Sequence, residues 1–240
     1  MPIRLGQSFE AYANVVGRDI SRLKGLKKDL RALNIGATAV GTAINVNPVY
    51  LFQIIKNINL ICGTDCYQAD DLFDATQNLD CFVHVSGALK TCASSLSKIC
   101  NDLRLLSSGP HAGLGEINLP PKQNGSSIMP GKINPVIPEV VSQVAFNVIG
   151  NDVTVTMAAE AGQLELNAFE PVIFYKIFES IDTLGGAVTT LIDNCVLGIT
   201  ANRDRCRRLV ETSSALATAL CPSLGYKLSA EIAKKALSTG

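Results

Sequence analysis

Charged residues, tryptophan and histidine are scarce in this chain of 240 residues. It contains no Trp and only two His, and 18% of its residues are charged, with 21 Lys and Arg against 21 Asp and Glu. Soluble domains usually carry about 25% charged residues. Because the charges are balanced and form no basic stretch, we expect neither a nucleic acid nor a membrane as a partner.

Long apolar runs are missing as well. No window approaches the about 18 apolar residues of a membrane-spanning helix, and the first residues match neither a secretory signal nor an organelle presequence. Apolar residues nevertheless make up 47% of the chain. We therefore expect them to lie in the protein interior and in interfaces between protein chains.

The cysteines do not form metal-binding patterns. The chain has eight cysteines, of which only Cys62 and Cys66 lie close together in sequence, and its only histidines are His84 and His111. Zinc sites need paired cysteines or histidine partners at short spacing. We expect reduced thiols inside helices, a cytoplasmic location, and no metal or cofactor.

Helical patterns cover most of the chain, and strand patterns are almost absent. Apolar residues in alternating steps of three and four predict a helix over 80–106. Two further long helices are apolar nearly all round, which indicates that other helices surround them. At about 40 Å each, the three suit an oligomeric bundle. The other predicted helices cover 135–161, 167–197, 8–33, 48–60, 202–220 and 227–237.

The loop over 107–134 carries the residues best suited to chemistry, in the string GSSIMPGKINP that begins at Gly125. Two serine hydroxyls, the charge of Lys132, and Asn134 at a helix N-terminus suggest an anion site. A phosphate-binding loop is set aside because the glycine spacing is one residue too long and Ile133 replaces Ser or Thr. A Ser–Lys nucleophile has no supporting motif. A tight turn ending in a helix cap explains the same residue types equally well.

GSSIMPGKINP closely resembles the signature of the fumarase/aspartase superfamily, whose members eliminate a group next to a carboxylate to leave fumarate. The likeness continues in LGQSFEAY, GATAVGT, SKICNDLRLLSSGP and GLGEINLP. The chain is more similar to the ammonia-lyase branch than to fumarases, which tend to have a basic residue where Glu170 stands. The resemblance implies an all-α fold, with a central helical bundle over 1–197 and part of a small helical C-terminal domain over 198–240.

The resemblance also implies roles for residues of the signature. Ser126 would remove a proton from the β-carbon of L-aspartate, giving an enediolate-like intermediate that loses ammonia. Ser127, Lys132, Asn134 and the backbone at Ile133 would hold the substrate carboxylates. Glu139 would pair with an active-site histidine. The family assembles each site from three subunits of a homotetramer.

Two family segments have no match in the chain. One is a Ser-Ser/Thr-Asn stretch and the other a Thr-His pair, so we expect the N-terminal domain to be missing and the site to be partial. Two alternatives to an ammonia-lyase stay open. One is a fumarase-type hydratase, because the same residues serve either leaving group, and the other is a catalytically incomplete oligomerisation fragment.

Overall fold

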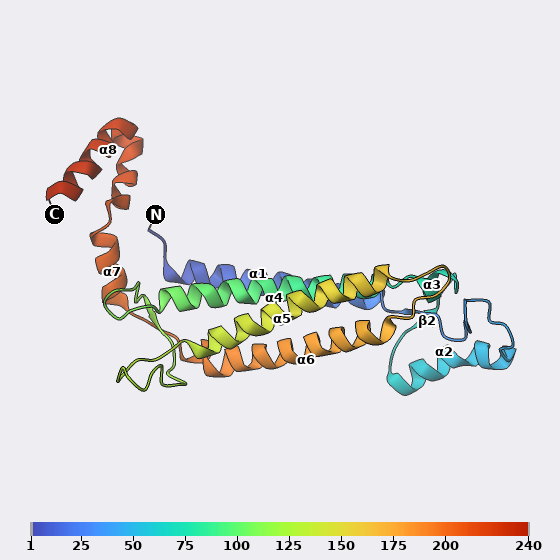
Figure 1. Ribbon diagram of the computed structural model, residues 1–240. Helices are drawn as coiled ribbons and strands as arrows, with labels where there is room; N and C mark the ends of the chain where they lie inside the picture. The colour runs from blue at the N-terminus through green and yellow to red at the C-terminus, as the bar shows by residue number, and fades with distance from the viewer. Residues whose placement is uncertain (1, 240) are drawn as a thin grey trace. The chain divides into compact units, whose positions relative to one another are not determined.

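A computed structural model describes residues 2–239, and most of its regular structure is helical (Figure 1). The all-α prediction is confirmed. The α-helices are α1 (Leu5–Gly25), α2 (Pro48–Cys62), α3 (Asp74–Gln77), α4 (Asp80–Leu106), α5 (Val136–Glu160), α6 (Glu170–Asn194), α7 (Arg203–Glu211) and α8 (Cys221–Thr239). The 3-10 helices are η1 (Leu26–Lys28), η2 (Val196–Gly198) and η3 (Ser214–Leu220).

Within the described residues, strands are limited to two short pairs. β1 (Ala32–Leu33) runs parallel to β2 (Tyr67–Gln68). β3 (Ile117–Asn118) runs antiparallel to β4 (Thr200–Ala201). The second pair matters for the site, because β3 lies in the connection between α4 and α5.

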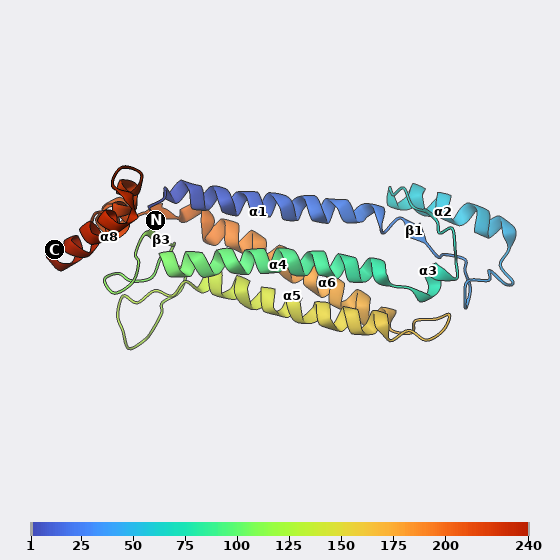
Figure 2. The same cartoon turned by 90° about the horizontal axis from the view of Figure 1, so that it is seen from above.

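The chain divides into two compact units, each made of several segments. The first comprises 2–14, Ile99–Pro138 and 191–239, and the second comprises Val15–Lys98 and Glu139–Thr190. Within the second unit, Figures 1 and 2 show the long helices running side by side. The domain boundary expected at residue 198 stays a prediction.

The core of the second unit lies between α4, α5 and α6. The heptad positions Val85, Leu89 and Leu96 of α4 are buried, as predicted. On α5, the buried residues recur mostly at steps of three and four, and Val141, Val148 and Val155 are at most 1% exposed. This spacing places one side of the helix in the core.

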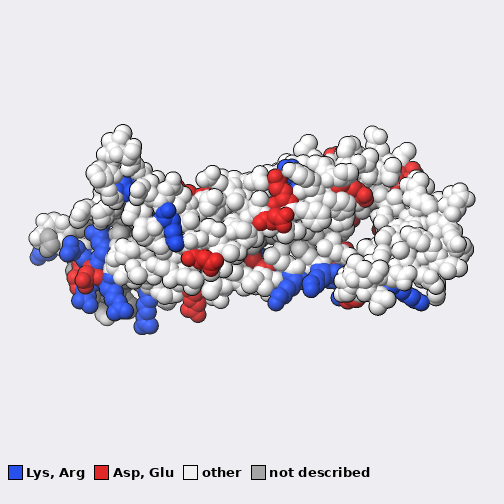
Figure 3. Space-filling model, turned by 90° about the horizontal axis from the view of Figure 1, so that it is seen from below, with Lys and Arg blue, Asp and Glu red and all other residues white. Residues whose placement is uncertain are grey.

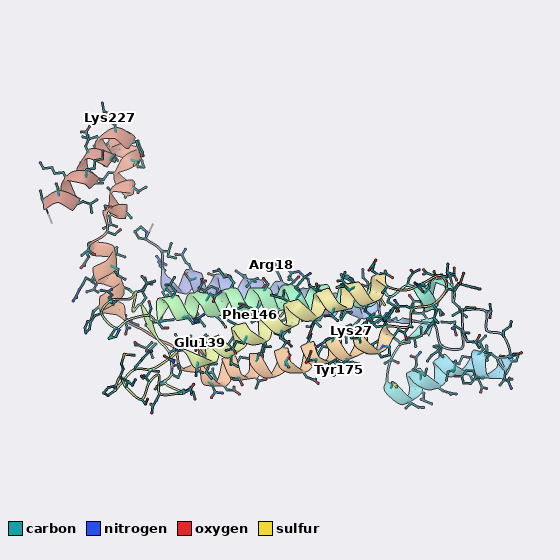
Figure 4. The ribbon with its side chains drawn as sticks, in the orientation of Figure 1. Arg18, Lys27, Glu139, Phe146, Tyr175 and Lys227 are labelled. Carbon is teal, nitrogen blue, oxygen red and sulfur yellow. The ribbon has the colours of Figure 1, made fainter. Side chains whose placement is uncertain are left out.

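The opposite side of α5 is apolar but exposed within this single chain. Phe146 is 62% exposed and Met157 64%, and on α6 Tyr175 and Phe178 are also exposed (Figure 4). Helices surround α5 on one side only. The apolar excess noted in the sequence is therefore partly surface.

Two polar groups lie on the helices of the second unit, one around Asp152 and one around Asn151. Lys90 Nζ lies 2.5 Å from Asp152 Oδ2. Asn151 Nδ2 donates to Glu179 Oε2 at 2.8 Å, and Lys176 Nζ donates to the same oxygen at 2.9 Å. These donors hold the pKa of Glu179 below its usual value. Buried polar groups need such partners to offset their loss of water.

Several predicted helix ends were wrong. The first helix ends at Gly25, and Leu33 lies in β1 because residues 31–33 hydrogen-bond to the segment around β2. The helix expected over 202–220 breaks after Glu211, where the Ser213 hydroxyl accepts the Ala215 N–H and starts η3. The long helices begin and end within three residues of their predicted limits.

No helix among residues 2–239 combines the length and apolar character needed to cross a membrane. On the face drawn in Figure 3, basic and acidic side chains form small groups separated by uncharged surface. Side chains of both signs are present on that face.

Candidate functional site

The signature residues lie in an internally bonded loop of the first unit. We call residues 124–134 the serine loop. Asn124 and Ile133 form an isolated antiparallel bridge. Gly125 N donates to Lys132 O at 2.7 Å, and Lys132 N donates to Met129 O at 3.3 Å. The two ends of the loop are thereby held together, while its tip is exposed.

The Ser126 hydroxyl is the acceptor of a small backbone nest. Its Oγ accepts hydrogen bonds from Ile128 N at 3.1 Å and from Met129 N at 3.2 Å. Two N–H groups aimed at one oxygen favour negative charge on that oxygen. The same geometry is that of a neutral serine in a turn, and it would also stabilise an alkoxide at Ser126 if one formed. The sequence indicated that loop N–H groups could do this but did not identify which.

Gly125 brings the other polar groups close to Ser126. A Cβ at this position would lie 2.8 Å from Asn134 Oδ1 and 2.9 Å from Lys132 O, closer than atoms tolerate. Asn134 Nδ2 donates to Gly125 O at 3.5 Å. A side chain here would displace the Lys132 backbone, and the small size of glycine lets Lys132 and Asn134 pack directly against the residue that precedes the serine.

The predicted start of α5 needs correction by one residue. The helix begins at Val136, not at Pro135, and the Asn134 side chain bonds back to the serine loop. Proline at position 138 fits because the first-turn N–H groups of a helix have no intrahelical acceptor. Asn134 therefore organises the loop.

The remaining candidates are more exposed. Ser127, Lys132 and Ile133 present their side chains to solvent, and Ile133 is 53% exposed. Glu139 lies in the first turn of α5, in the second unit, and is partly buried (Figure 4). Acidic residues are stabilised at this end of a helix.

Two further residues, missed from the sequence, contact the same connection. Arg205 and Asn202 donate hydrogen bonds to carbonyl oxygens of residues 113–115. The sequence shows a charged stretch after residue 202, but its partners are more than 80 residues away. No local pattern could have identified them.

The cysteines are all free thiols, in agreement with the sequence. Burial raises the pKa of Cys100 to about 12 and also raises the pKa of Cys195, and both side chains are buried. Cys62, in contrast, is exposed. Among residues 2–239, no three His, Cys, Asp or Glu side chains gather into a group that could hold a metal ion.

Comparison with known proteins places this loop in a family. The profile of a family described as Lyase matches residues 1–150. The chain belongs to this lyase family. It is 51% identical over 240 residues to an aspartate ammonia-lyase of Bacillus subtilis, covering 100% of the chain and 50% of that protein. An aspartate ammonia-lyase of Helicobacter pylori is 56% identical over 239 residues, with 51% of it covered.

Solved structures agree with this membership of the lyase family. A fumarate lyase:delta crystallin of Brucella melitensis superposes with a TM-score of 0.95 at 54% identity, covering 100% of this chain and 52% of that one. A class II fumarase of Schistosoma mansoni gives 0.86 at 32% identity, covering 98% and 52%. The resemblance to the fumarase/aspartase superfamily and its helical bundle is confirmed. The chain spans about half the length of the curated relatives it matches.

Proposed function

We propose that this chain supplies the base-bearing part of an aspartate ammonia-lyase site, which converts L-aspartate reversibly to fumarate and ammonia. The observation that carries the proposal is the Ser126 hydroxyl, held by two backbone N–H groups inside GSSIMPGKINP. Relatives named aspartate ammonia-lyase, 51–56% identical over the whole chain, support the choice of reaction.

The first step is removal of a proton from the β-carbon of L-aspartate by the Ser126 alkoxide. A free serine hydroxyl is too weak a base for this step at neutral pH. The Ile128 and Met129 N–H groups, 3.1 and 3.2 Å from Oγ, stabilise the alkoxide and cost no reorganisation when the reaction occurs. The positive charge of Lys132 on the same loop acts in the same direction.

The electron pair left at the β-carbon moves into the neighbouring carboxylate and gives an enediolate-like dianion. Donors aimed at that carboxylate bind the transition state more strongly than the substrate, which lowers the barrier. Ser127, Lys132, Asn134 and the Ile133 N–H are the donors that we assign to the substrate carboxylates. Their place around Gly125 keeps them within one short loop.

Loss of ammonia completes the reaction. The carbon–nitrogen bond breaks, its electron pair leaves with the nitrogen as NH₃, and the pair at the β-carbon forms the double bond of fumarate. The proton taken by Ser126 returns to solvent or to the released ammonia. These steps use side chains of the protein and no cofactor.

Glu139 has a supporting role in this proposal. We assign it as the partner of an active-site histidine, which it would hold in one orientation and keep protonated. Its place in the first turn of α5 favours the ionised carboxylate. The histidine would come from a segment that does not match this chain.

The assembly that fits this site is a homotetramer built through the long helices. Large apolar side chains exposed on α5 and α6 support it, because monomeric soluble proteins rarely expose extended apolar patches. Neighbouring subunits would cover this surface and bring further site residues to the serine loop. Free thiols throughout support a reducing, cytoplasmic location. The exposed apolar residues on these helices are Phe146, Val153, Met157, Tyr175, Phe178 and Ile181.

Two alternatives have specific support. One is a hydratase acting on L-malate, which the 32% identity to a class II fumarase favours. The roles assigned to Ser126, Lys132 and Asn134 are the same whether ammonia or water leaves. The exposed apolar side chains of α5 and α6 favour the second alternative, a catalytically incomplete oligomerisation fragment.

The test compares fumarate formation from L-aspartate and from L-malate, followed by ultraviolet absorbance. It uses the isolated chain and a hybrid in which the chain replaces the matching half of the Bacillus subtilis relative. We expect the hybrid to act on L-aspartate. Higher activity on L-malate would favour the hydratase, and a folded, assembled hybrid without either activity would contradict the proposal.

A further inference from the structure

The connection between α4 and the serine loop is tied down at residues 113–118, which we call the loop base. Arg205 of α7 donates two hydrogen bonds to it, from Nε to Leu114 O at 2.9 Å and from a terminal guanidinium nitrogen to Gly113 O at 2.9 Å. The planar guanidinium presents its donors as a fixed fork, which matches two adjacent carbonyl oxygens.

Asn202, immediately before α7, continues the same pattern. Its Nδ2 donates to Gly115 O at 2.9 Å, and its backbone N donates to Glu116 O at 2.9 Å. The side chains of Asn202 and Asn118 also exchange hydrogen bonds at 2.7 and 2.9 Å. Two residues therefore supply donors to the four consecutive carbonyl groups of residues 113–116.

The loop base has a cavity on one side and close contacts elsewhere. An open cavity of about 380 Å³ borders Glu116 on one side and Cys206 and Leu209 of α7 on the other. At the end of the loop base, the backbone of Gly198 approaches Pro120 so closely that a Cβ would lie 2.4 Å from Pro120 Cγ. Hydrogen bonds, the pairing of β3 with β4 and the buried side chain of Ile117, which is 1% exposed, hold this segment.

The exposed residues 121–123 separate the loop base from the serine loop. The hydrogen bonds described above for Gly125, Ser126 and Lys132 lie within the serine loop itself. The path of the serine loop is thus set at one end by the loop base and at the other by the start of α5.

We propose that Asn202 and Arg205 are positioning residues for the serine loop. They fix the loop base, and through it the orientation in which Ser126 meets a dicarboxylate. This role rests on the proposed function, because that function gives the orientation of Ser126 its purpose. Neither residue touches the substrate in this proposal.

The test uses the full chain and a fluorescent reporter in the serine loop. The sequence has no Trp, and Ile128 is 87% exposed, so Ile128→Trp gives a signal from this loop alone. In that background, Arg205→Ala should lower the fluorescence anisotropy at position 128. It should also speed tryptic cleavage after Lys122 and Lys132 about tenfold, because opening of the loop base becomes easier.

Two comparisons separate positioning from a general effect of charge. Arg207→Ala removes an exposed arginine from the same helix and should leave both readouts at the parent level. Arg205→Lys keeps the charge but loses the fork, so it should restore cleavage and anisotropy only in part. Asn202→Asp removes the donor to Gly115 O and should match or exceed Arg205→Ala, which keeps the test decisive if one variant fails to fold.

Parent-level cleavage and anisotropy in folded Arg205→Ala and Asn202→Asp would overturn the proposal. Full rescue by Arg205→Lys, or an equal effect of Arg207→Ala, would overturn it too. Helix content by circular dichroism identifies folded variants. These readouts need no substrate, so their failure is distinguishable from the failure of the hybrid to form fumarate.

Discussion

The Lys90–Asp152 pair offers a sharp test of how polar groups are held in the helical core. The Asp152 side chain is 7% exposed, and that of Lys90 is 45% exposed. Breaking a fully buried pair costs about 3–5 kcal/mol, whereas exposed pairs contribute about 0–1 kcal/mol. Because Lys90 reaches solvent while Asp152 does not, we expect Lys90→Met to cost about 2 kcal/mol, an intermediate value.

A double-mutant cycle measures the coupling. Asp152→Leu leaves a lysine that can turn to water, so it should cost about 1 kcal/mol, and the double variant should fall within about 1 kcal/mol of the parent. The two single effects sum to about 3 kcal/mol, so the predicted coupling is about 2–4 kcal/mol. Urea unfolding followed by circular dichroism gives the free energies, with Lys24→Met on the exposed surface of α1 as the control. Additive single effects would show that Lys90 and Asp152 do not stabilise each other.

Three further predictions follow from the same structure. Gly125→Ala should reduce turnover of the hybrid by about tenfold to a hundredfold at unchanged thermal stability, because Lys132 O must move to admit the Cβ. The control is Gly131→Asn, at an open position with φ of 80°, and it should retain most activity. Hydrogen bonds from Lys176 and Asn151 lower the pKa of Glu179 from 4.5, so the ionised carboxylate stabilises the fold fully above that pH and loses this effect as the pH falls below it. Glu179→Gln should therefore flatten the acid unfolding curve below pH 4.5. An unchanged curve would count against this pairing. A thiol reagent at mildly alkaline pH should modify the exposed Cys62 quickly but Cys100 and Cys195 only on unfolding, since burial raises the pKa of both. Fast reaction of all three would contradict the burial of Cys100 and Cys195.

Periodicity predicted the long helices well because their apolar residues repeat along the chain. The limits of α4 agree with the prediction, and Val85 and Leu89 are buried as expected. The partial exposure of α5 could not be predicted, because composition does not distinguish burial within a chain from burial between chains. Phe146 has the same apolar character as Val148, yet one is exposed and the other is not.

The serine loop was identified from its sequence, but its geometry was not. The donors to Ser126 are backbone groups of Ile128 and Met129, which any residue could supply. The hydrogen bonds of Asn202 and Arg205 join residues 84 to 92 positions apart. Such contacts arise from the folded arrangement and leave no periodic pattern.

We assign Ser126 as the base of an ammonia-lyase site. The most direct measurement is L-aspartate-dependent fumarate formation by the hybrid, with and without Ser126→Ala, at equal helix content and equal oligomeric mass. We predict that the substitution lowers turnover by about a hundredfold to ten-thousandfold, the usual contribution of a general base. Near-parent turnover in the folded Ser126→Ala hybrid would contradict the account.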